Sequence, residues 1–250
     1  MGLKIVAMPA GYIRNAHGPA VTLLRNWDKR FDSPMISFAV LGGEHPVIVD
    51  SGTPAPEFVR EHHSYNFTRS DDEAPLAQLS RIGVDPADVG TVVFTHLHWD
   101  HCGNTDLFPN ARFVVQADEL AYAMDPLPPN RTAYERTGEV SPPWLDVLGR
   151  LETVRGSVTL APGISTVPLP GHTPGSQGVL VETDAGRFLI AGDCIDTYEN
   201  WTGDGKLAHI PSGSFTNLHH YWASFERIEQ LGCEVVPSHD PAVLERGTFG

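Results

Sequence analysis

The sequence predicts an α/β protein, a four-layer αβ/βα sandwich in which two mixed sheets are flanked by helices. Short apolar runs typical of strands occur in both halves of the chain, and each half ends in a helical pattern. The length of 250 residues suits one α/β unit. We therefore expect residues 1–250 to form a single domain.

The first half of the chain contains five apolar segments that we expect to be strands, residues 4–8, 36–41, 47–50, 91–94 and 112–116. A helix is expected over residues 72–83, because Leu76, Leu79 and Ile82 recur on one helical face. Residues 117–124 are expected to form a second, shorter helix.

Residues 53–72 show no convincing period and mix aromatic, polar and proline residues, so we interpret them as a long ordered loop. Loops of this length in compact domains are often lids or binding loops. The adjacent His62 and His63 lie in this loop. We expect both to be surface histidines and not metal ligands.

Residues 125–144 contain five prolines, which exclude a continuous helix or a central strand. We interpret them as an insertion near the mouth of the functional site. Tyr134 and Trp144 lie within this segment and need apolar surface to pack against. The segment is therefore not expected to be a domain linker.

The second half of the chain restarts the strand pattern, with expected strands at residues 164–169, 177–182, 188–191 and 234–237. The turn Asp184-Ala185-Gly186 predicts a hairpin between two of them. A helix is expected over residues 215–231, with one apolar face formed by Leu218, Trp222, Phe225 and Ile228.

Composition excludes several classes of protein. Hydrophobic residues make up 41% and charged residues 19%, which is typical of a globular protein and not of a disordered one. The net charge of -14 argues against nucleic acid or an anionic membrane as partner. No apolar run approaches the roughly 18 residues of a membrane span, and no secretion signal is evident. The three cysteines form no Cys-x-x-Cys pattern, so we expect a reducing cytoplasm.

The strand expected at residues 91–94 is followed by four side chains of types that bind metals. His96, His98, Asp100 and His101 lie within six positions. Imidazole nitrogens and carboxylate oxygens are ligands that zinc accepts. Because side chains alternate along an extended segment, His96 and His98 lie on the same face of it. The turn that follows brings Asp100 and His101 to a second position that could hold a metal. Two adjacent metals suit this string better than one.

The wider string His96-Leu97-His98-Trp99-Asp100-His101-Cys102-Gly103-Asn104 resembles the signature of the metallo-β-lactamase superfold. It is most similar to the branch that contains the N-acyl-homoserine lactone hydrolases, which are quorum-quenching lactonases, and pyridoxolactonase. This resemblance implies the same sandwich fold. It also implies a supporting role for the aspartate of Asp50-Ser51-Gly52, which orients the metal-site backbone in that superfold.

The resemblance also supplies three later ligands, His172, Asp193 and His239, each of which follows an expected strand. It implies that His96, His98 and His172 hold one metal. It implies that Asp100, His101 and His239 hold the other metal, with Asp193 as the bridge. Zinc is the first choice for both positions, and manganese, iron or cobalt would fit the same ligands.

This ligand set implies a hydrolase in which a water shared by the two metals attacks a carbonyl. The expected reaction is the opening of a lactone, which makes a small molecule the expected partner. Asp193 and Asp100 are candidate catalytic residues, and Asp100 is placed to relay a proton to the leaving oxygen. Nothing in the sequence decides the oligomeric state, and an oligomer is possible.

Position 196 departs from the lactonase pattern. The lactonases carry a tyrosine three residues after the bridging aspartate, where this chain has Asp196. The nearest tyrosine, Tyr198, is a third candidate catalytic residue. We expect an apolar cleft lined by Trp27, Met35, Phe67, Tyr198 and Trp201.

Two alternatives to a lactonase stay open. The first is a metal-dependent hydrolase of another acyl bond, such as an amide, imide or thioester, since the group that holds the carbonyl has changed. The second is a non-hydrolytic di-metal protein of the same fold.

Overall fold

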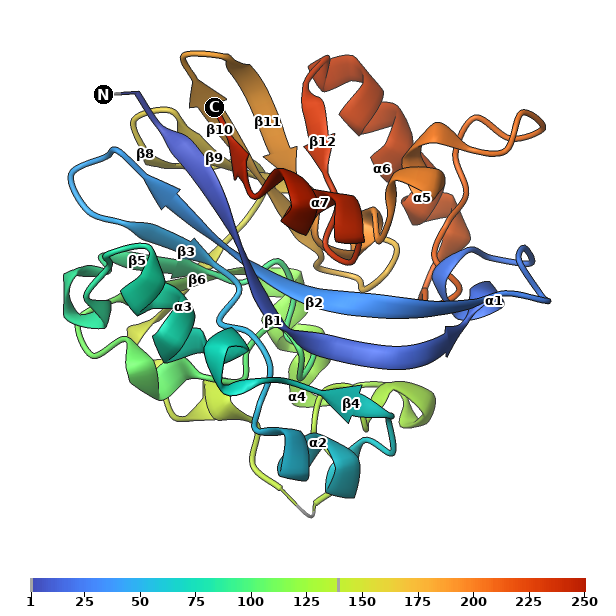
Figure 1. Ribbon diagram of the computed structural model, residues 1–250, viewed down its shortest axis with the longest axis horizontal. Coiled ribbons are helices and arrows are strands. Elements are labelled where there is room, and N and C mark those ends of the chain that lie inside the picture. The colour runs from blue at the N-terminus through green and yellow to red at the C-terminus, as the bar shows by residue number, and fades with distance from the viewer. Residues whose placement is uncertain (1, 139) are drawn as a thin grey trace.

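The computed structural model describes residues 2–138 and 140–250, and it confirms the predicted αβ/βα sandwich. Two mixed sheets pack face to face, and helices cover their outer surfaces (Figure 1). The apolar layer between the sheets takes side chains from both of them. Phe38 and Val93 come from the first sheet, whereas Val179 and Ile190 come from the second.

The first sheet has the strand order β13-β1-β2-β3-β5-β6-β7, with β4 paired to β1 at one side. Its strands are β1 (Lys4–His17), β2 (Arg30–Leu41), β3 (Val47–Val49), β4 (Phe67–Thr68), β5 (Thr91–Val93), β6 (Arg112–Gln116), β7 (Leu151–Val154) and β13 (Thr248–Phe249). Strands β3, β5, β6 and β7 are parallel, and β1 and β2 pair antiparallel.

Strands β1 and β2 are longer than the sequence predicts. The expected strand at residues 4–8 continues to His17, and the register shifts between Pro9 and Tyr12 and again between Ile13 and Ala16. These irregularities break the alternation of apolar and polar residues on which the prediction depends.

The second sheet has the order β12-β11-β10-β9-β8. Its strands are β8 (Thr159–Ala161), β9 (Ile164–Pro168), β10 (Gln177–Thr183), β11 (Gly186–Ile190) and β12 (Glu234–Val236). The predicted hairpin between β10 and β11 is confirmed, and β12 lies parallel to β11. Strands β4, β7, β8 and β13 have at most four residues and escape prediction from the sequence.

Three helices carry most of the outer cover, namely α3 (Pro75–Arg81), α4 (Ala117–Met124) and α6 (Leu218–Leu231). Helix α6 begins three residues later than predicted, where Asn217 caps it by accepting a hydrogen bond from the His220 amide. Its buried face contains Tyr221, Phe225 and Ile228. The predicted face was partly wrong, because Leu218 is 41% and Trp222 40% exposed.

Four further helices are α1 (Gly18–Val21), α2 (Pro56–His62), α5 (Tyr198–Thr202) and α7 (Pro241–Arg246). None exceeds seven residues, and none of the four was predicted from the sequence. Helix α2 and strand β4 lie within residues 53–72, so the prediction that this segment is a loop throughout was wrong.

Short 3-10 helices occupy several connections: η1 (Asp71–Glu73), η2 (Pro86–Asp88), η3 (Thr105–Leu107), η4 (Pro128–Asn130), η5 (Pro143–Leu145), η6 (Leu148–Arg150) and η7 (Gly192–Cys194). No helix in the described part of the chain combines the length and the apolarity needed to cross a membrane.

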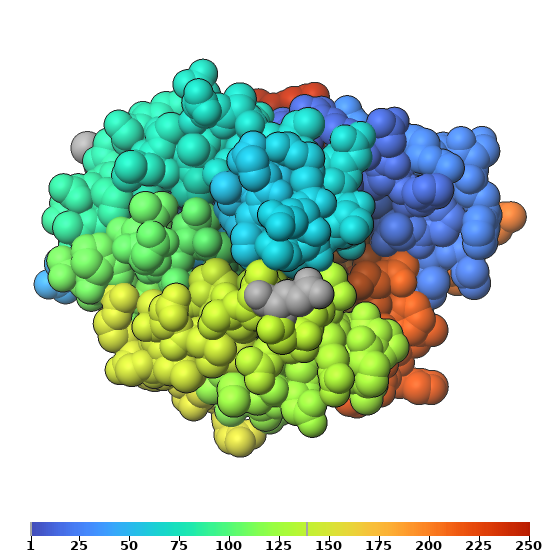
Figure 2. Space-filling view, turned by 90° about the horizontal axis from the view of Figure 1, so that it is seen from below, coloured from blue at the N-terminus to red at the C-terminus, as the bar shows by residue number. Residues whose placement is uncertain are grey.

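The segments 53–72 and 125–144 lie side by side on one face of the molecule, in blue-green and yellow-green (Figure 2). Residue 139 of the second segment lies outside the described residues. The described part of 125–144 carries only the 3-10 helices η4 and η5, as its prolines require. Its Tyr134 and Trp144 are fully buried, in agreement with a segment packed onto the domain.

Candidate metal centre

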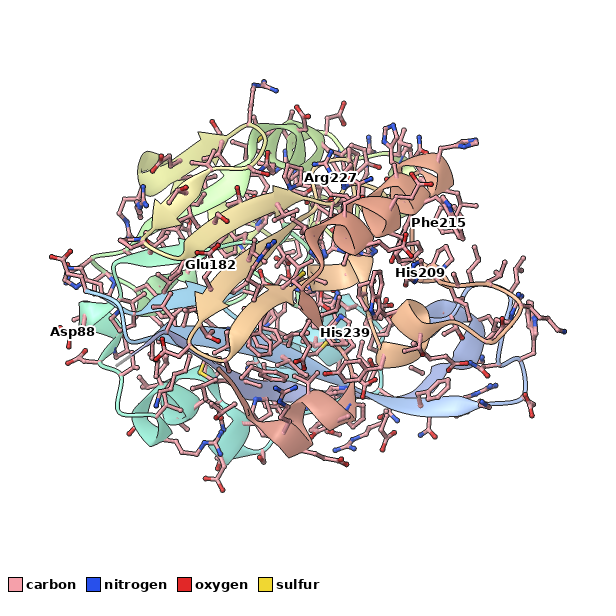
Figure 3. All side chains as sticks on the ribbon, turned by 90° about the horizontal axis from the view of Figure 1, so that it is seen from above. Asp88, Glu182, His209, Phe215, Arg227 and His239 are labelled. Carbon is pink, nitrogen blue, oxygen red and sulfur yellow. The ribbon has the colours of Figure 1, made fainter. Side chains whose placement is uncertain are left out.

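Loops that follow four strands meet at one edge of the sandwich and bring the predicted ligands together. The ligand string follows β5, and the loops after β9, β11 and β12 carry the others. His239, which follows β12, lies toward the middle of the molecule between the sheets (Figure 3). Two groups of side chains capable of holding a metal result: His96, His98 and His172, and Asp100, His101, Asp193 and His239.

Within each group, one ligand atom of every residue lies within 4.8 Å of the others. In the first group, Nε2 of His172 lies 3.1 Å from Nδ1 of His98. Two nitrogens that each lie about 2.0–2.1 Å from a shared tetrahedral zinc are separated by about 3.4 Å. In the second group, Nε2 of His101 lies 3.5 Å from Oδ2 of Asp100. Both spacings suit ligands of a common cation.

Asp193 lies between the two groups and presents one carboxylate oxygen to each. Its Oδ1 is 3.0 Å from Nε2 of His239 and 3.2 Å from Nε2 of His101. Its Oδ2 is 3.5 Å from Nε2 of His172 and 3.8 Å from Nε2 of His96. This geometry is the one that a bridging carboxylate requires.

The buried nitrogens at the centre lack other partners. Among the described residues, Nε2 of His96 and of His101 accepts and donates no hydrogen bond. A buried polar atom without a partner is costly, and a bound cation removes that cost for an imidazole nitrogen. The donor set of imidazoles and carboxylates is the set that divalent transition metals prefer. These residues therefore fit metal ions.

Asp50 contacts His101 of the second group at Nδ1, the ring nitrogen that does not face the other ligands. Its Oδ2 lies 2.8 Å from Nδ1 of His101, which leaves Nε2 of that ring directed at the metal position. The same carboxylate accepts hydrogen bonds from the backbone amide and the hydroxyl of Thr95, at 2.7 and 2.8 Å. Asp50 thus orients both a ligand and the start of the ligand loop.

Backbone carbonyls orient two more ligand rings. Nδ1 of His172 donates to the carbonyl of Ser214 at 2.8 Å, and Nδ1 of His239 donates to the carbonyl of Pro34 at 2.9 Å. In the neutral ring, which carries one N–H, each bond places that proton on Nδ1 and makes Nε2 the nitrogen that can bind a cation. The protein therefore selects the tautomer that binds metal.

The charges at the centre shift the pKa values of its groups in opposite directions. Burial alone would raise the pKa of Asp193, but the facing His239, His101 and His96 outweigh it and hold the pKa well below its usual range. Burial lowers the pKa of His239, yet the neighbouring Asp193 and Asp196 carboxylates reverse this and raise it to about 9. The metal-free centre is therefore a network of ion pairs around Asp193.

For His96 and His98 burial dominates and lowers the pKa of both rings well below the usual value. Each ring also faces other histidines of the centre, and their positive charge when protonated lowers the pKa further. Both rings are consequently neutral near pH 7, which is the form that binds a metal.

A cavity of about 510 Å³ opens onto the two ligand groups. Its apolar wall includes Ile13, Val21, Met35 and Trp99. Of the five side chains expected to line the cleft, Met35 does so, and Trp27, Phe67, Tyr198 and Trp201 do not. Trp27 is 68% exposed, and Phe67 is fully buried beneath Trp99.

Tyr198 does not reach the cavity, contrary to expectation. Its ring packs against the apolar layer between the sheets. Its backbone amide donates to Asp240, and the charges nearest to its hydroxyl are Glu234, Asp240 and Arg246. Helix α5 begins at Tyr198 and turns the ring away from the ligands, so the structure supports no catalytic role for this residue.

Asp196, at the departure from the lactonase pattern, does line the cavity and is 7% exposed. Burial raises the pKa of this carboxyl to about 7, and the neighbouring Asp193 adds to the effect. The backbone carbonyl of Asp196 accepts a hydrogen bond from the amide of His239. The residue is thus built into the wall of the metal centre.

His63 also differs from expectation. It is 7% exposed and pairs with buried Glu135, which lies in the segment 125–144. Its ring stacks on Trp99, the residue between the ligands His98 and Asp100. The adjacent His62 is partly exposed, as predicted. A buried role for His63 was not visible in the sequence because its partner lies 72 positions away.

Glu119 in α4 is a buried residue that the sequence analysis missed. Its carboxylate accepts hydrogen bonds from the amide of Leu97, the hydroxyl of Tyr134 and the hydroxyl of Thr173. Burial raises the pKa of Glu119. It joins the ligand string, the segment 125–144 and the loop that carries His172. An acidic residue in a short amphipathic helix gives no sign of such a role.

Comparison with known protein families gives a match that extends well beyond the string His96–Asn104. A family model described as the metallo-beta-lactamase superfamily matches residues 34–239. That range contains all seven predicted ligands and the strands that position them.

Curated relatives carry the name N-acyl homoserine lactonase. The enzyme of a Bacillus species is 27% identical over 219 residues, which cover 84% of this chain and 82% of that protein. The lactonase AttM of Rhizobium radiobacter is 35% identical over 176 residues, which cover 68% of this chain and 65% of that protein. The resemblance to the lactonase branch is thereby supported.

Solved structures show the same fold. A quorum-quenching N-acyl homoserine lactone hydrolase superposes with a TM-score of 0.76 at 21% identity, covering 96% of this chain and 93% of that one. The dizinc quorum-quenching lactonase AidC superposes with a TM-score of 0.74 at 17% identity, covering 98% and 89%. Fold, ligand geometry and family match agree, and the chain belongs to the metallo-beta-lactamase superfamily.

Proposed function

We propose that this protein is a dinuclear metal-dependent hydrolase that opens lactones. The observation that carries the proposal is the position of Asp193, which offers one oxygen to each of two ligand groups. A single metal would not need this arrangement. Two divalent cations, zinc first and manganese, iron or cobalt as alternatives, would supply an activated water and polarise a carbonyl when bound.

The protein contributes positioning and proton transfer. Asp193 fixes the spacing of the two groups, and Asp50 and the carbonyls of Ser214 and Pro34 hold the ligand rings in place. Asp100 lines the cavity, and its side chain is 12% exposed, so it is accessible to a bound molecule. We assign to Asp100 the transfer of a proton from the attacking water to the ring oxygen that leaves the opened ester.

Two observations support a lactone as the substrate. The curated relatives are named for action on N-acyl homoserine lactones. The cavity of about 510 Å³ has the size of a small-molecule site, and apolar side chains line part of it. The three free cysteines, Cys102, Cys194 and Cys233, fit the reducing cytoplasm as the place of action.

A second candidate is hydrolysis of another acyl bond at the same centre. The specific observation in its favour is Asp196, which stands where lactonases carry a carbonyl-holding tyrosine. An amide, imide or thioester would use the same activated water, and only the contacts around the carbonyl would differ.

The test is an assay of purified protein on a panel of lactones, amides and thioesters after loading with zinc. Chelator-sensitive opening of lactones, with weak or no turnover of the other classes, is expected. Turnover of an amide or thioester in preference to every lactone would favour the second candidate. Two redox-active irons per chain together with oxygen consumption would contradict both.

A further inference from the structure

Glu119 is a buried acid that belongs neither to the cavity wall nor to the two ligand groups. It lies in α4 and is fully buried. It is absent from the lining of the cavity and from the residues whose atoms gather into the ligand groups. A buried carboxylate is costly unless donors surround it, so the donors that meet Glu119 indicate what it does.

Three donors meet the two carboxylate oxygens. The backbone amide of Leu97 and the hydroxyl of Tyr134 donate to Oε1 at 2.9 and 2.8 Å. The hydroxyl of Thr173 donates to Oε2 at 2.6 Å. Thr173 has one proton to give, so the hydroxyl of Ser176, 2.6 Å from it, donates to Thr173 in turn. Both oxygens of Glu119 therefore have partners within the protein.

Two of these donors lie next to ligands of the first group in the chain. Leu97 stands between His96 and His98, so its amide belongs to the backbone that carries both rings. Thr173 directly follows His172. One carboxylate thus joins the loop after β5 to the loop after β9, and these two loops supply all the ligands of the first group.

Two further contacts strengthen this connection. The ring of Tyr134, whose hydroxyl Glu119 holds, packs edge-on against the ring of His98 with centroids 4.6 Å apart. Gly175, in the same loop as His172, packs so closely on the backbone of Glu119 that no side chain would fit there. Among the described residues, no hydrogen bond of Glu119 ends on a member of the second group.

We infer that Glu119 is a positioning residue for the first metal position, where it holds the two ligand loops at the separation that a cation requires. Asp50 has the corresponding place at the second group, through Nδ1 of His101. The inference rests on the two-metal centre of the proposed function and does not depend on which bond is hydrolysed. Loss of Glu119 weakens one metal position and spares the other.

The first experiment measures cobalt(II) binding in two single-site backgrounds by competition with a chromophoric chelator. His239→Ala removes a ligand of the second group, and His172→Ala removes one of the first. Adding Glu119→Ala to His239→Ala is expected to lower the affinity by about 10- to 100-fold, the usual effect of removing a group that orients ligands. Adding it to His172→Ala should change the affinity by less than about twofold. Equal weakening in both backgrounds, or none in the first, would overturn the inference.

The second experiment uses the chain with all seven ligands. At a chelator concentration that leaves two cobalt ions on the unaltered protein, Glu119→Ala should retain one. The absorption spectrum of that ion should match the spectrum of cobalt bound to His172→Ala, in which the second position remains. Retention of both ions, or a spectrum that matches His239→Ala, would contradict the assignment to the first position.

Glu119→Gln guards against a folding defect in the alanine variant. Its amide oxygen can still accept from Leu97 and Tyr134, and its amide nitrogen can donate to Thr173. We expect it to weaken the first position by about 3- to 10-fold, the size of one weakened hydrogen bond, and to spare the second. If the alanine variant does not fold, the glutamine variant decides, and an unchanged affinity at the first position would refute the role.

Asp118→Asn is the matched control, because Asp118 is the preceding residue of the same helix. Its side chain is 69% exposed and pairs with Arg155 at the surface. This variant also loses one carboxylate from α4, and both cobalt affinities should stay within about twofold of those of the unaltered protein. Weakening of the first position by Asp118→Asn as large as that by Glu119→Gln would attribute the effect to charge alone and contradict the inference.

Cobalt binding separates this inference from the proposed function, because it requires no turnover. If the protein opens no lactone but Glu119→Ala weakens only the first position, the lactonase proposal fails and the role of Glu119 stands. If lactones are opened and Glu119→Ala keeps both affinities, the proposed function stands and the role is wrong. A protein that binds neither cobalt nor zinc would overturn both.

Discussion

His63 and Glu135 lie 72 positions apart in the chain, and Nε2 of the imidazole is 3.1 Å from Oε1 of the carboxylate. Both side chains are buried, and the pair joins the segment 53–72 to the segment 125–144. His63 also stacks on Trp99, with ring centroids 4.6 Å apart, and Trp99 forms part of the cavity wall. The pair therefore connects two surface segments to the residue between two predicted metal ligands.

Replacing His63 by alanine is expected to destabilise the protein by about 3 kcal/mol, because it leaves the Glu135 carboxylate buried without its partner. His62→Ala, one position away and partly exposed, should change stability by less than about 0.5 kcal/mol. Chemical denaturation of the three proteins measures both effects. Neither variant removes a ligand, so each should retain two metals. Equal stability of the two variants would show that the pair contributes nothing.

Replacing Asp193 by asparagine is expected to lower metal occupancy at both positions and to abolish most activity. One carboxylate faces both ligand groups, so its loss weakens two sites at once. Elemental analysis after dialysis and the lactone assay check the two effects. Full activity with two metals bound would disprove the bridging role.

Replacing Asp50 by alanine is expected to weaken metal binding by about 10- to 100-fold, the usual effect of removing a group that orients a ligand. Asp50 contacts His101 and not His96, so the effect should fall on the position held by Asp100, His101 and His239. Competition with a chromophoric chelator resolves the two affinities. Equal weakening at both positions would indicate general disruption of the centre.

Metal binding should release protons, and the affinity should rise with pH up to about 9. In the metal-free protein, Asp193 and Asp196 raise the pKa of His239 to about 9, so this ring is protonated at pH 7 and must lose its proton before it binds a cation. Calorimetry in two buffers of different ionisation enthalpy counts the released protons. An affinity that does not change between pH 6 and 9 would contradict this picture.

The same shift predicts the pH dependence of the metal-free protein. Because the folded pKa of His239 lies above its usual value, its ion pair stabilises the fold fully below about pH 6.5. That contribution is lost as the pH rises through about 9. The metal-free protein should lose this stabilisation over the pH range in which its affinity for metal increases. Thermal melts of the chelated protein across this range provide the measurement.

The sequence pointed to the side chains that the structure gathers into two groups, because each follows a strand closely and residue type and chain order carry that information. It predicted the sandwich for the same reason, since the buried strands contain unbroken apolar runs. Contacts between distant segments were not predictable. Glu119 accepts from Leu97 and Thr173, which lie 22 and 54 positions away, and nothing in its own helix indicates this.

The direction of the Tyr198 side chain could not be predicted from the sequence either, for a different reason. Its distance along the chain from Asp193 suggested a place in the cavity, but a five-residue helix begins at Tyr198 and its ring packs against the apolar layer between the sheets. The direction of a side chain near a short helix depends on where the helix begins. A capping box formed by Thr197 and Asn200 sets that start, and the motif was recognisable only once the helix was known.

The ligands of each group come from both halves of the chain. His96, His98, Asp100 and His101 follow a strand of the first sheet, and His172, Asp193 and His239 follow strands of the second. A cation in either position therefore acts as a cross-link between the two sheets. Such a cation would bind the folded chain and not the unfolded chain, in which the two halves are apart. The melting temperature would therefore rise with the concentration of free metal. If the proposed function holds, depletion of metal would remove the catalytic cations and would also weaken the attachment of one sheet to the other.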